Sequence, residues 1–449
     1  MTTQVSVNPG VGLKTSHRGG YVQDLVNTRP SLDSTTLGAA TTLVQTCRDR
    51  AEALLTDRPL PTTREEEWRF TDLTPLTQVK FVGVAVDRPV PSVSEINAFI
   101  HPETATTRLV FVNGVYAPQL SDLSGLPAGA IVGNLTTVAS QYPQLSEYLG
   151  QQQGAEEIFT SLNTASLTDA AVVWLARNQA IDSPIQLLFV TTPGEAPEIN
   201  QPRCLVVAEP GSSATLLEEY VTLNPGVYFT NGVTEIWLGE NAQLHHTRLQ
   251  QESQAAFHIG KTAVSQARDS RYTCNAVSLG AELSRHHLEV YQTGEQTETT
   301  LNGLTMISGD QTADTHSLIG YTRPHGSSQQ IHKCIVDGHG HAIFNGKVFV
   351  PQAAQLTNAA QLSSNLLLSP KARVDTKPQL EITADNVKCT HGATVSQLDS
   401  DEVFYLQSRG IDAHSSRKLL TFAFAYDVLG QIPVASLRDS LSQLVRNQV

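Results

Sequence analysis

The stretch GENAQLHHTRLQ, residues 239–250, begins with a glycine, continues with polar residues and then alternates apolar and polar side chains. Such alternation is typical of a β-strand, in which successive side chains point to opposite faces. Segments of the same kind begin at five other glycines: GSSATLLEEY (211–220), GAELSRHHLEVY (280–291), GEQTETTLNGL (294–304), GDQTADTHSLIGY (309–321) and GHAIFNGKVFV (340–350). No helical periodicity separates these segments. Strands that recur in this way predict a solenoid, so we expect a mainly β protein with a β-helix core.

Three regions divide the chain. A hairpin is predicted at RLVFVNGVYA, residues 108–117, because Asn113 and Gly114 join two apolar runs and both tolerate positive φ. The turns between the later segments lack the tight-turn sequences that the connections of a β-sandwich would need. We therefore expect an N-terminal helical domain at residues 1–100, the β-helix core at 101–395 and a C-terminal helical domain at 396–449.

The N-terminal region is expected to be helical because apolar residues recur on one helical face. These residues are Leu43, Val44, Cys47, Ala51, Leu54 and Leu55. Further on, Thr63 and Glu66 have the spacing of a capping box, which predicts a short helix with Trp68 and Phe70 as buried anchors. The first residues, MTTQVSVNPGVGLKTSHRGG, lack the apolar core of a signal peptide, and we expect a disordered tail of a cytoplasmic protein.

The C-terminal region predicts three short helices. Asp399, with Glu402 three residues later, forms a capping box at the start of the first helix. Asp412 can cap a longer second helix that includes LLTFAFAYDVL, residues 419–429. The third helix carries Leu437, Leu441, Leu444 and Val445. These helices cap the end of the solenoid or, if their aromatic side chains are exposed, form a docking surface.

Composition and motifs exclude several classes of protein. A formal net charge of −13 argues against binding to nucleic acids or anionic membranes, because phosphate recognition requires clustered Lys and Arg. The five cysteines are widely spaced, which indicates a reducing compartment and no metal cluster held by this chain alone. The motifs HExxH, GxSxG and GxGxxG are absent, so we do not expect an enzyme. A carbohydrate-active β-helix enzyme stays an alternative, with Asp310 and Asp314 as the nearest carboxylates.

Histidines gather in the second half of the chain, with 11 of 14 between residues 245 and 391. In the adjacent pairs at 245–246 and 286–287, one ring is expected to point into the solenoid and the other outward. Interior rings either hydrogen-bond locally or ligate a metal. The candidates for a metal site are His332, Cys334, His339 and His341. Cys389 and His391 form a further pair, because residues two positions apart in a strand point to the same side. Thiol and imidazole together would supply half of a metal site.

From residue 343 to about 430, and again at TREEEWRFTDLTPL (63–76), the sequence resembles the SufB/SufD family of iron–sulfur cluster assembly scaffolds. The matching segments are FNGKVFV, AAQLTNAAQLSSNLLLSPKARVDTKPQLEI, ADNVKCTHGATV and LDSDEVFYLQSRGI. Within the family the chain looks like the D type. The B type carries a cysteine in the neighbourhood of Ser363 and acidic residues beside its histidine, whereas here Thr390 and Gly392 flank His391.

This resemblance implies a right-handed parallel β-helix between two helical domains. It also implies a complex with one SufB and two SufC ATPase subunits. For the isolated protein, a homodimer is the alternative to this complex. His391, with Cys389 as a second candidate, would then contribute to a transient iron–sulfur cluster at the contact with SufB. ATP would be bound only through SufC. The residues implied in SufC binding lie within 399–449, and the candidates are Phe404, Tyr405, Phe422, Phe424 and Tyr426.

Two further expectations accompany the resemblance. The compartment would be the cytoplasm, or the plastid stroma in a plastid-bearing organism. The alternative within the same family is a purely architectural subunit, a rigid spacer that positions its partners and supplies no ligand of its own.

Overall fold

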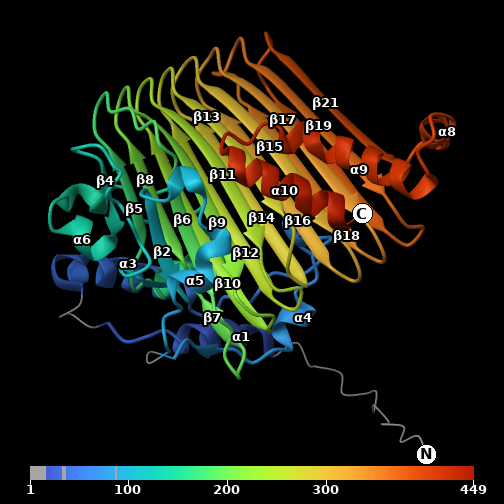
Figure 1. Cartoon of the computed structure of the whole chain (residues 1–449). Helices are drawn as coiled ribbons and strands as arrows, with labels where there is room; N and C mark the ends of the chain where they lie inside the picture. Colours follow the sequence, from blue (N-terminus) through green and yellow to red (C-terminus); the bar gives the residue numbers. More distant parts are fainter. Residues whose placement is uncertain (1–16, 33–36, 86–87, 449) are drawn as a thin grey trace, which may run out of the picture.

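The computed structural model describes residues 17–32, 37–85 and 88–448. The tail that the sequence predicts lies outside these residues as far as residue 16. The described chain is mainly β and forms a parallel solenoid (Figure 1), as the glycine-initiated segments predict. Its successive long strands alternate between two sheets, so that each turn of the solenoid adds one strand to each sheet.

We call the two sheets sheet A and sheet B. Sheet A contains β4 (Ile131–Asn134), β5 (Ala171–Leu175), β8 (Arg203–Ala208), β10 (Tyr228–Leu238), β12 (Phe257–Gln266), β14 (Leu283–Gln292), β16 (Thr312–Tyr321), β18 (His341–Val350) and β20 (Arg373–Ile382), with the short β1 (Val82–Gly83) and β7 (Glu198–Asn200) paired beside them. Sheet B contains β2 (Arg108–Val112), β3 (Val115–Tyr116), β6 (Ile185–Thr191), β9 (Ser213–Thr222), β11 (Gln243–Gln251), β13 (Arg271–Ser278), β15 (Glu298–Ile307), β17 (Ser327–Val336), β19 (Asn358–Leu367) and β21 (Lys388–Ser396).

The long strands pair without slippage, so residues at equivalent positions form straight rows through the solenoid. Because paired residues in a parallel sheet lie on the same face, each row is either interior or exterior along its whole length. One interior row of sheet B is central to the site described below, and we call it the His391 row. From β9 to β21 it contains Leu216, His246, Cys274, Leu301, Gln330, Gln361 and His391.

Three short N-terminal elements, α5 (Val93–Ile96), η3 (Asn97–Phe99) and η4 (Pro102–Thr104), lie against the outer face of sheet B. The other N-terminal elements cover the outer face of sheet A: α1 (His17–Asn27), η1 (Gly38–Ala40), α3 (Thr41–Leu55), η2 (Glu66–Trp68) and α4 (Thr74–Thr77). Trp68 is buried there, and Arg285 of β14 lies over its ring at 4.0 Å from the centroid. Burial of this aromatic ring against the sheet fixes the segment to the solenoid.

The same face also receives helices from within the range 101–395 that we expected to be continuous β-helix. They are α6 (Leu135–Ala139), η5 (Pro143–Glu147) and α7 (Ile158–Ala165). The hairpin at the start of this range is confirmed, since β2 and β3 pair antiparallel around Asn113 and Gly114, both with positive φ. The capping box at Thr63 and Glu66 is wrong: η2 begins one residue after Glu65, whose carboxylate accepts from the Thr62 backbone N–H at 2.8 Å.

The C-terminal helices are α8 (Ser400–Ser408), α9 (Ala413–Leu429) and α10 (Ala435–Gln448). Asp399 and Asp412 cap α8 and α9 as expected, because each carboxylate accepts from backbone N–H groups of the first turn. The helices α9 and α10 lie across the outer face of sheet B, whereas α8 projects beyond it (Figure 1). Among the described helices, none combines the length and the apolar character that crossing a bilayer requires.

Candidate functional site at the open end of the solenoid

The solenoid ends at β20 and β21, which are the terminal strands of sheets A and B. Within the described chain no further strand pairs with them, so their outer edges are unpaired at this end of the solenoid (Figure 1). At the opposite end, sheet B terminates in the antiparallel β2–β3 hairpin and sheet A terminates in β4. An unpaired strand edge presents backbone N–H and C=O groups that another polypeptide could pair with.

The interior positions of β21 are held by Cys389, His391, Ala393 and Val395, because they pair with the interior residues of β19. Their counterparts one turn deeper are almost completely buried: Ala359 is 2% exposed and Gln361 is 3% exposed. His391 is exposed and Val395 is 49% exposed although they continue the same rows. The exposure of these side chains therefore comes from the missing next turn of the solenoid.

Cys389 lies half-buried on this surface. It packs against the main hydrophobic cluster of the solenoid interior and pairs with Ala359. Burial raises the pKa of its thiol above the ordinary value, although a backbone hydrogen bond at Ala359 opposes this effect. The protonated thiol is therefore favoured in the isolated chain, as is typical of a cysteine that acts as a small apolar side chain.

The structure brings Cys389 and His391 to the same side of β21, as the spacing predicts. The described residues contain no group of three or more His, Cys, Asp or Glu that could hold a metal ion. A complete ligand set at the open end would thus need groups from another molecule.

The other candidate metal ligands lie apart from this site. His332 is buried and stacked on Phe344, with ring centroids 4.7 Å apart, and one ring nitrogen is 3.2 Å from the Thr305 hydroxyl. His341 pairs with Asp375 at 2.7 Å. Cys334 is also buried, and burial raises the pKa of its thiol to about 12. These residues are structural, and no metal site is formed among them.

At positions 245–246 one histidine points into the solenoid and the other outward, as expected. His246 is fully buried in the interior, 3.0 Å from a Glu218 carboxylate oxygen and 2.9 Å from the Tyr272 hydroxyl, whereas His245 is half-exposed. Burial alone would lower the pKa of His246, but its hydrogen bonds with Cys274 and Glu218 raise it to about 9. The ring is a charged, hydrogen-bonded part of the core.

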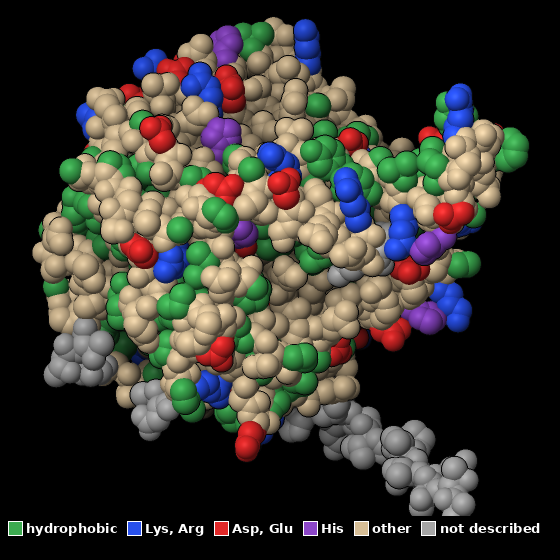
Figure 2. Space-filling view, in the orientation of Figure 1, with side chains coloured by type: hydrophobic (Ala, Val, Ile, Leu, Met, Phe, Trp, Pro, Cys, Tyr) green, Lys and Arg blue, Asp and Glu red, His purple; other side chains and the backbone are tan. Residues whose placement is uncertain are grey.

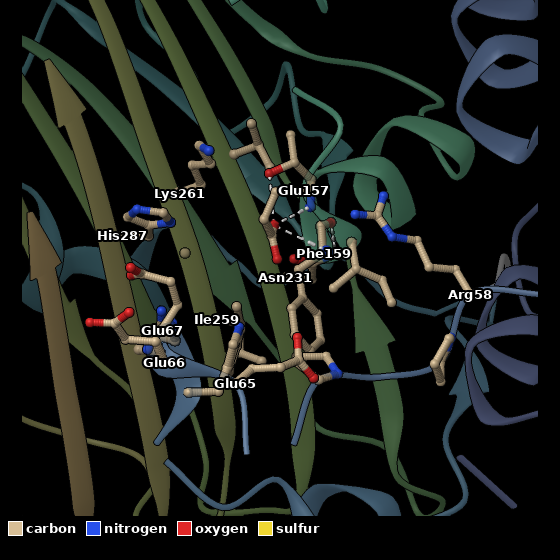
Figure 3. Close-up of a pocket in the computed structure, with 18 residues that line it drawn as sticks. Arg58, Glu65, Glu66, Glu67, Glu157, Phe159, Asn231, Ile259, Lys261 and His287 are labelled. Carbon is tan, nitrogen blue, oxygen red and sulfur yellow. Dashed lines mark hydrogen bonds between the residues drawn. The ribbon is translucent and has the colours of Figure 1, made fainter. Parts of the chain in front are cut away.

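At positions 286–287, His286 is buried in the interior and lies 3.1 Å from the Thr262 hydroxyl. Its neighbour His287 faces the outer side of sheet A, in a pocket of about 390 Å³ beneath the N-terminal segment. Glu67 of that segment, with His287 and Lys261 of the sheet, surrounds the pocket (Figure 3). Lys261 is 2.9 Å from Glu289, and His287 is 3.1 Å from the same carboxylate. These three sheet residues therefore bond to one another, whereas Glu67 of the N-terminal segment lies 3.1 Å from His316 of β16.

The carboxylates proposed for a carbohydrate enzyme do not form a cluster. Asp314 is buried, where it pairs with Arg285 and accepts a hydrogen bond from Thr71 of the N-terminal segment. Asp310 is exposed, and its carboxylate is 3.6 Å from His339. One carboxylate is a structural anchor and the other is on the surface, so the pair required for acid and base catalysis is not assembled.

The aromatic residues of the C-terminal helices differ in their exposure. Phe404 and Tyr405 of α8 are 70% and 58% exposed, and Tyr426 of α9 is 45% exposed. Phe422 and Phe424 are only half-buried: Arg446 lies over the ring of Phe422, and Phe424 packs on sheet B. Figure 2 shows the projecting helices as a separate lobe that carries both apolar and charged side chains. We call Leu419, which is 46% exposed, and the three exposed aromatic residues the α8–α9 apolar surface.

Gln361 is the residue of this site that the sequence analysis missed. It precedes His391 in the interior row, one turn deeper in the solenoid, and is separated from it by 30 positions in the sequence. Its place depends on the lengths of the turns between β19 and β21. Only the strand register identifies it, so no local signal would have found it.

Comparison with known proteins shows similarity along most of the chain. A family model described as the SufBD core domain of SUF system FeS cluster assembly matches residues 189–424, and a model of the SufBD protein N-terminal region matches residues 33–187. An iron–sulfur cluster assembly SufBD family protein of Synechocystis is 49% identical over 407 residues, covering 89% of each chain. A chloroplastic protein of Arabidopsis thaliana, ABCI7, is 34% identical over 90% of this chain and 86% of its own length. The iron–sulfur cluster assembly protein SufD of Escherichia coli is 32% identical over 82% of this chain and 84% of its own length.

Proposed function

Because the chain belongs to the SufBD family of SUF-system iron–sulfur cluster assembly proteins, we propose that it is the D-type subunit of a SufBCD scaffold. In this proposal its open end binds SufB, and His391 supplies one ligand to a cluster that forms between the two subunits. The cluster is the cargo of the scaffold. The chain has no reaction of its own and holds no cofactor when isolated.

The observation that carries the proposal is the position of His391. It is the exposed last member of an interior row whose preceding member, Gln361, is 3% exposed. A solenoid of similar cross-section placed on β20 and β21 would pair their free edges and enclose the imidazole. Enclosure between two subunits brings the ring close to ligands of the partner and excludes water from them.

The small number of ligands suits a scaffold that must release its product. Four thiolates from one chain hold an iron–sulfur cluster stably. One imidazole from this chain, completed by groups of the partner, gives a ligand set that separates when the subunits move. Cys389 is a second candidate ligand in this proposal, but it would have to lose the proton that burial favours. An imidazole, by contrast, ligates in its neutral form and need not become an anion.

The second part of the proposal assigns the α8–α9 apolar surface to SufC. Phe404, Tyr405 and Tyr426 project from the body of the protein, and exposed apolar surface of this kind is typical of protein interfaces. Phe422 and Phe424 pack against the apolar cluster between the C-terminal helices and sheet B, and so help to hold α9 in place. ATP would be bound by SufC alone. The C-terminal helices would transmit the movement of the SufC subunits to the open end of the solenoid.

The location proposed for this complex is the cytoplasm, or the plastid stroma where the organism has plastids. The chloroplastic name of the Arabidopsis relative supports the second location for plant members.

The decisive experiment is anaerobic co-expression with SufB and SufC, with His391→Ala compared with the wild-type chain. We expect the variant to assemble normally and to lose the cluster absorption of the purified complex. His414→Ala, which changes an exposed histidine on α9, is the matched control and should keep the cluster. Undiminished cluster formation in His391→Ala would instead support a purely architectural spacer. Loss of assembly in the variant would show that His391 acts in subunit contact.

A further inference from the structure

The interior beneath His391 contains a short chain of hydrogen-bonded side chains that runs toward the open end. The Gln330 amide nitrogen donates to the Ser317 hydroxyl at 2.8 Å, and the Gln361 amide nitrogen donates to the Gln330 carbonyl oxygen at 2.8 Å. All three side chains are buried, with exposed fractions of 5% or less. Each amide thus uses its nitrogen to bond toward the interior.

The last carbonyl oxygen of this chain has no partner. The Gln361 Oε1 atom is buried without a hydrogen bond. Buried polar atoms are rarely left in this state, because the lost hydration costs about 1–3 kcal/mol. The next residue in the same interior row is His391, whose ring nitrogen can carry a proton.

The absence of a side chain at Gly346 leaves room for the Gln361 amide. A Cβ atom at position 346 would lie 2.2 Å from the Gln361 Nε2 atom and 2.8 Å from its Cδ atom. The space opposite the amide is therefore available only because this residue is a glycine. The Gln361 nitrogen thus bonds to the Gln330 carbonyl of the preceding turn, and its oxygen keeps the capacity to accept a hydrogen bond.

We propose that Gln361 is a positioning residue for His391: its carbonyl oxygen accepts a hydrogen bond from one ring nitrogen when a partner closes the open end. The bond selects a single tautomer and directs the other ring nitrogen, with its lone pair, toward the partner. Outer contacts of this kind orient histidine ligands and increase their basicity in many metal sites. This inference rests on the proposed function for its purpose, but the hydrogen bond itself can be measured without iron.

The test uses the cluster-free complex with SufB and SufC, in which only this chain carries ¹⁵N-labelled histidine. His391→Ala identifies the His391 signals by their loss, and the ¹⁵N shifts then give the tautomer ratio at a pH where the ring is neutral. We expect one tautomer in the wild type. In Gln361→Met, which keeps the length and removes the acceptor, we expect the ratio to change roughly five-fold, the factor for one ordinary net hydrogen bond.

Two further variants separate positioning from general damage. Gln361→Glu keeps an acceptor oxygen, although it loses the N–H that bonds to Gln330, and should favour the wild-type tautomer more than Gln361→Met does. Asn365→Leu removes another buried amide of β19 that has Val395 as its register partner, and should leave the His391 tautomer unchanged. An unchanged ratio in Gln361→Met, or an equal change in Asn365→Leu, would overturn the inference. If the tautomer follows Gln361 but His391→Ala still forms clusters, the positioning holds and the ligand role fails.

Discussion

The Arg203 guanidinium of β8 lies against the Glu235 carboxylate of β10 beneath the helical covering of sheet A, with Nε and Oε2 3.1 Å apart. Their side chains are 1% and 2% exposed. Arg203 also donates to Asn163 Oδ1 at 3.0 Å, and Glu235 accepts from the Gly150 backbone N–H at 2.9 Å. One buried ion pair thus joins two neighbouring strands to the helical insertion that covers them.

Glu235→Ala should therefore destabilise the protein strongly. Removing one member of a buried ion pair leaves the other charge uncompensated, which costs about 3–5 kcal/mol. Chemical denaturation followed by circular dichroism measures this loss. The double variant Arg203→Met with Glu235→Leu removes both charges and should be more stable than Glu235→Ala. A double variant that is the less stable of the two would contradict this account.

The solenoid could be predicted because its signal is local and repeated. Each strand carries its own alternation and each turn its own glycine, so GENAQLHHTRLQ alone indicates a strand. The same holds for the helix starts at Asp399 and Asp412, where one carboxylate bonds to the N–H groups beside it. These features need no knowledge of distant residues.

The features that failed or were missed depend on distant residues. The segment after Thr63 is placed by contacts such as Thr71 with Asp314, which are 243 positions apart. The capping box predicted at Thr63 and Glu66 is wrong by one residue, because Glu65 bonds to the backbone of Thr62 instead. The relation of Gln361 to His391 also depends on distant residues, because it follows from the strand register across one full turn of the solenoid. That register cannot be deduced from the lengths of the turns in the sequence.

The interior pair of Glu218 and His246 predicts a pH dependence of stability. Burial alone would raise the pKa of Glu218, but the hydrogen bond and charge of His246 and the charge of Arg248 lower it to about 2. The pKa of His246 is raised to about 9 by its hydrogen bonds with Cys274 and Glu218 against the effect of burial. In an unfolded chain the two groups titrate at about 4.3 and 6.5.

The sign of each contribution follows from these values. The stabilisation from His246 is complete below about pH 6.5 and is lost as the pH rises through about 9. The stabilisation from Glu218 is complete above about pH 4.3 and is lost as the pH falls toward about 2. Melting temperatures measured across this range should be highest between the two limits. His246→Gln should reduce the alkaline loss, and an identical alkaline slope in that variant would exclude His246 as its source.

Two glycines near the open end should respond differently to the same substitution. Gly346→Ala places a Cβ atom 2.2 Å from Gln361 Nε2 and 2.7 Å from Phe344 Cζ, inside the packed core. We expect a loss of about 1–3 kcal/mol from overpacking. At Gly392 a Cβ atom meets only the Leu362 side chain, at 3.4 Å, so Gly392→Ala should change the free energy of unfolding little. Equal losses at the two positions would contradict the packing described for Gln361.

The open end should also mediate self-association when no partner is present. Val395 is 49% exposed on β21, beside the free strand edge, and a lysine there would place a charge in any contact between two such ends. We expect the isolated wild-type chain to sediment as a dimer and Val395→Lys to sediment as a monomer. Val115→Lys, at an apolar side chain 64% exposed on β3 at the other end, is the control and should remain dimeric. A monomeric wild-type chain would contradict this prediction.

The α8–α9 apolar surface should determine co-purification of SufC. Phe404 is 70% exposed and makes few contacts within the chain, so Phe404→Asp should leave the melting temperature unchanged and abolish SufC binding. The comparison is Phe424→Asp, because the Phe424 ring packs on sheet B and lies 4.3 Å from the Lys333 ammonium group. That variant should lose stability as well as binding, since it places a second carboxylate beside the Lys333–Asp427 ion pair and breaks apolar packing.

Measured together by thermal denaturation and affinity co-purification, the two variants distinguish a binding surface from a structural one. Retention of SufC by Phe404→Asp at wild-type levels would exclude α8 from the interface. Loss of binding only in Phe424→Asp, with a lowered melting temperature, would show that the helices need to be folded but that SufC docks elsewhere. Only a loss of binding at unchanged stability in Phe404→Asp assigns the contact to the exposed face, because that side chain does not contribute to the packing of α9 and α10 on sheet B.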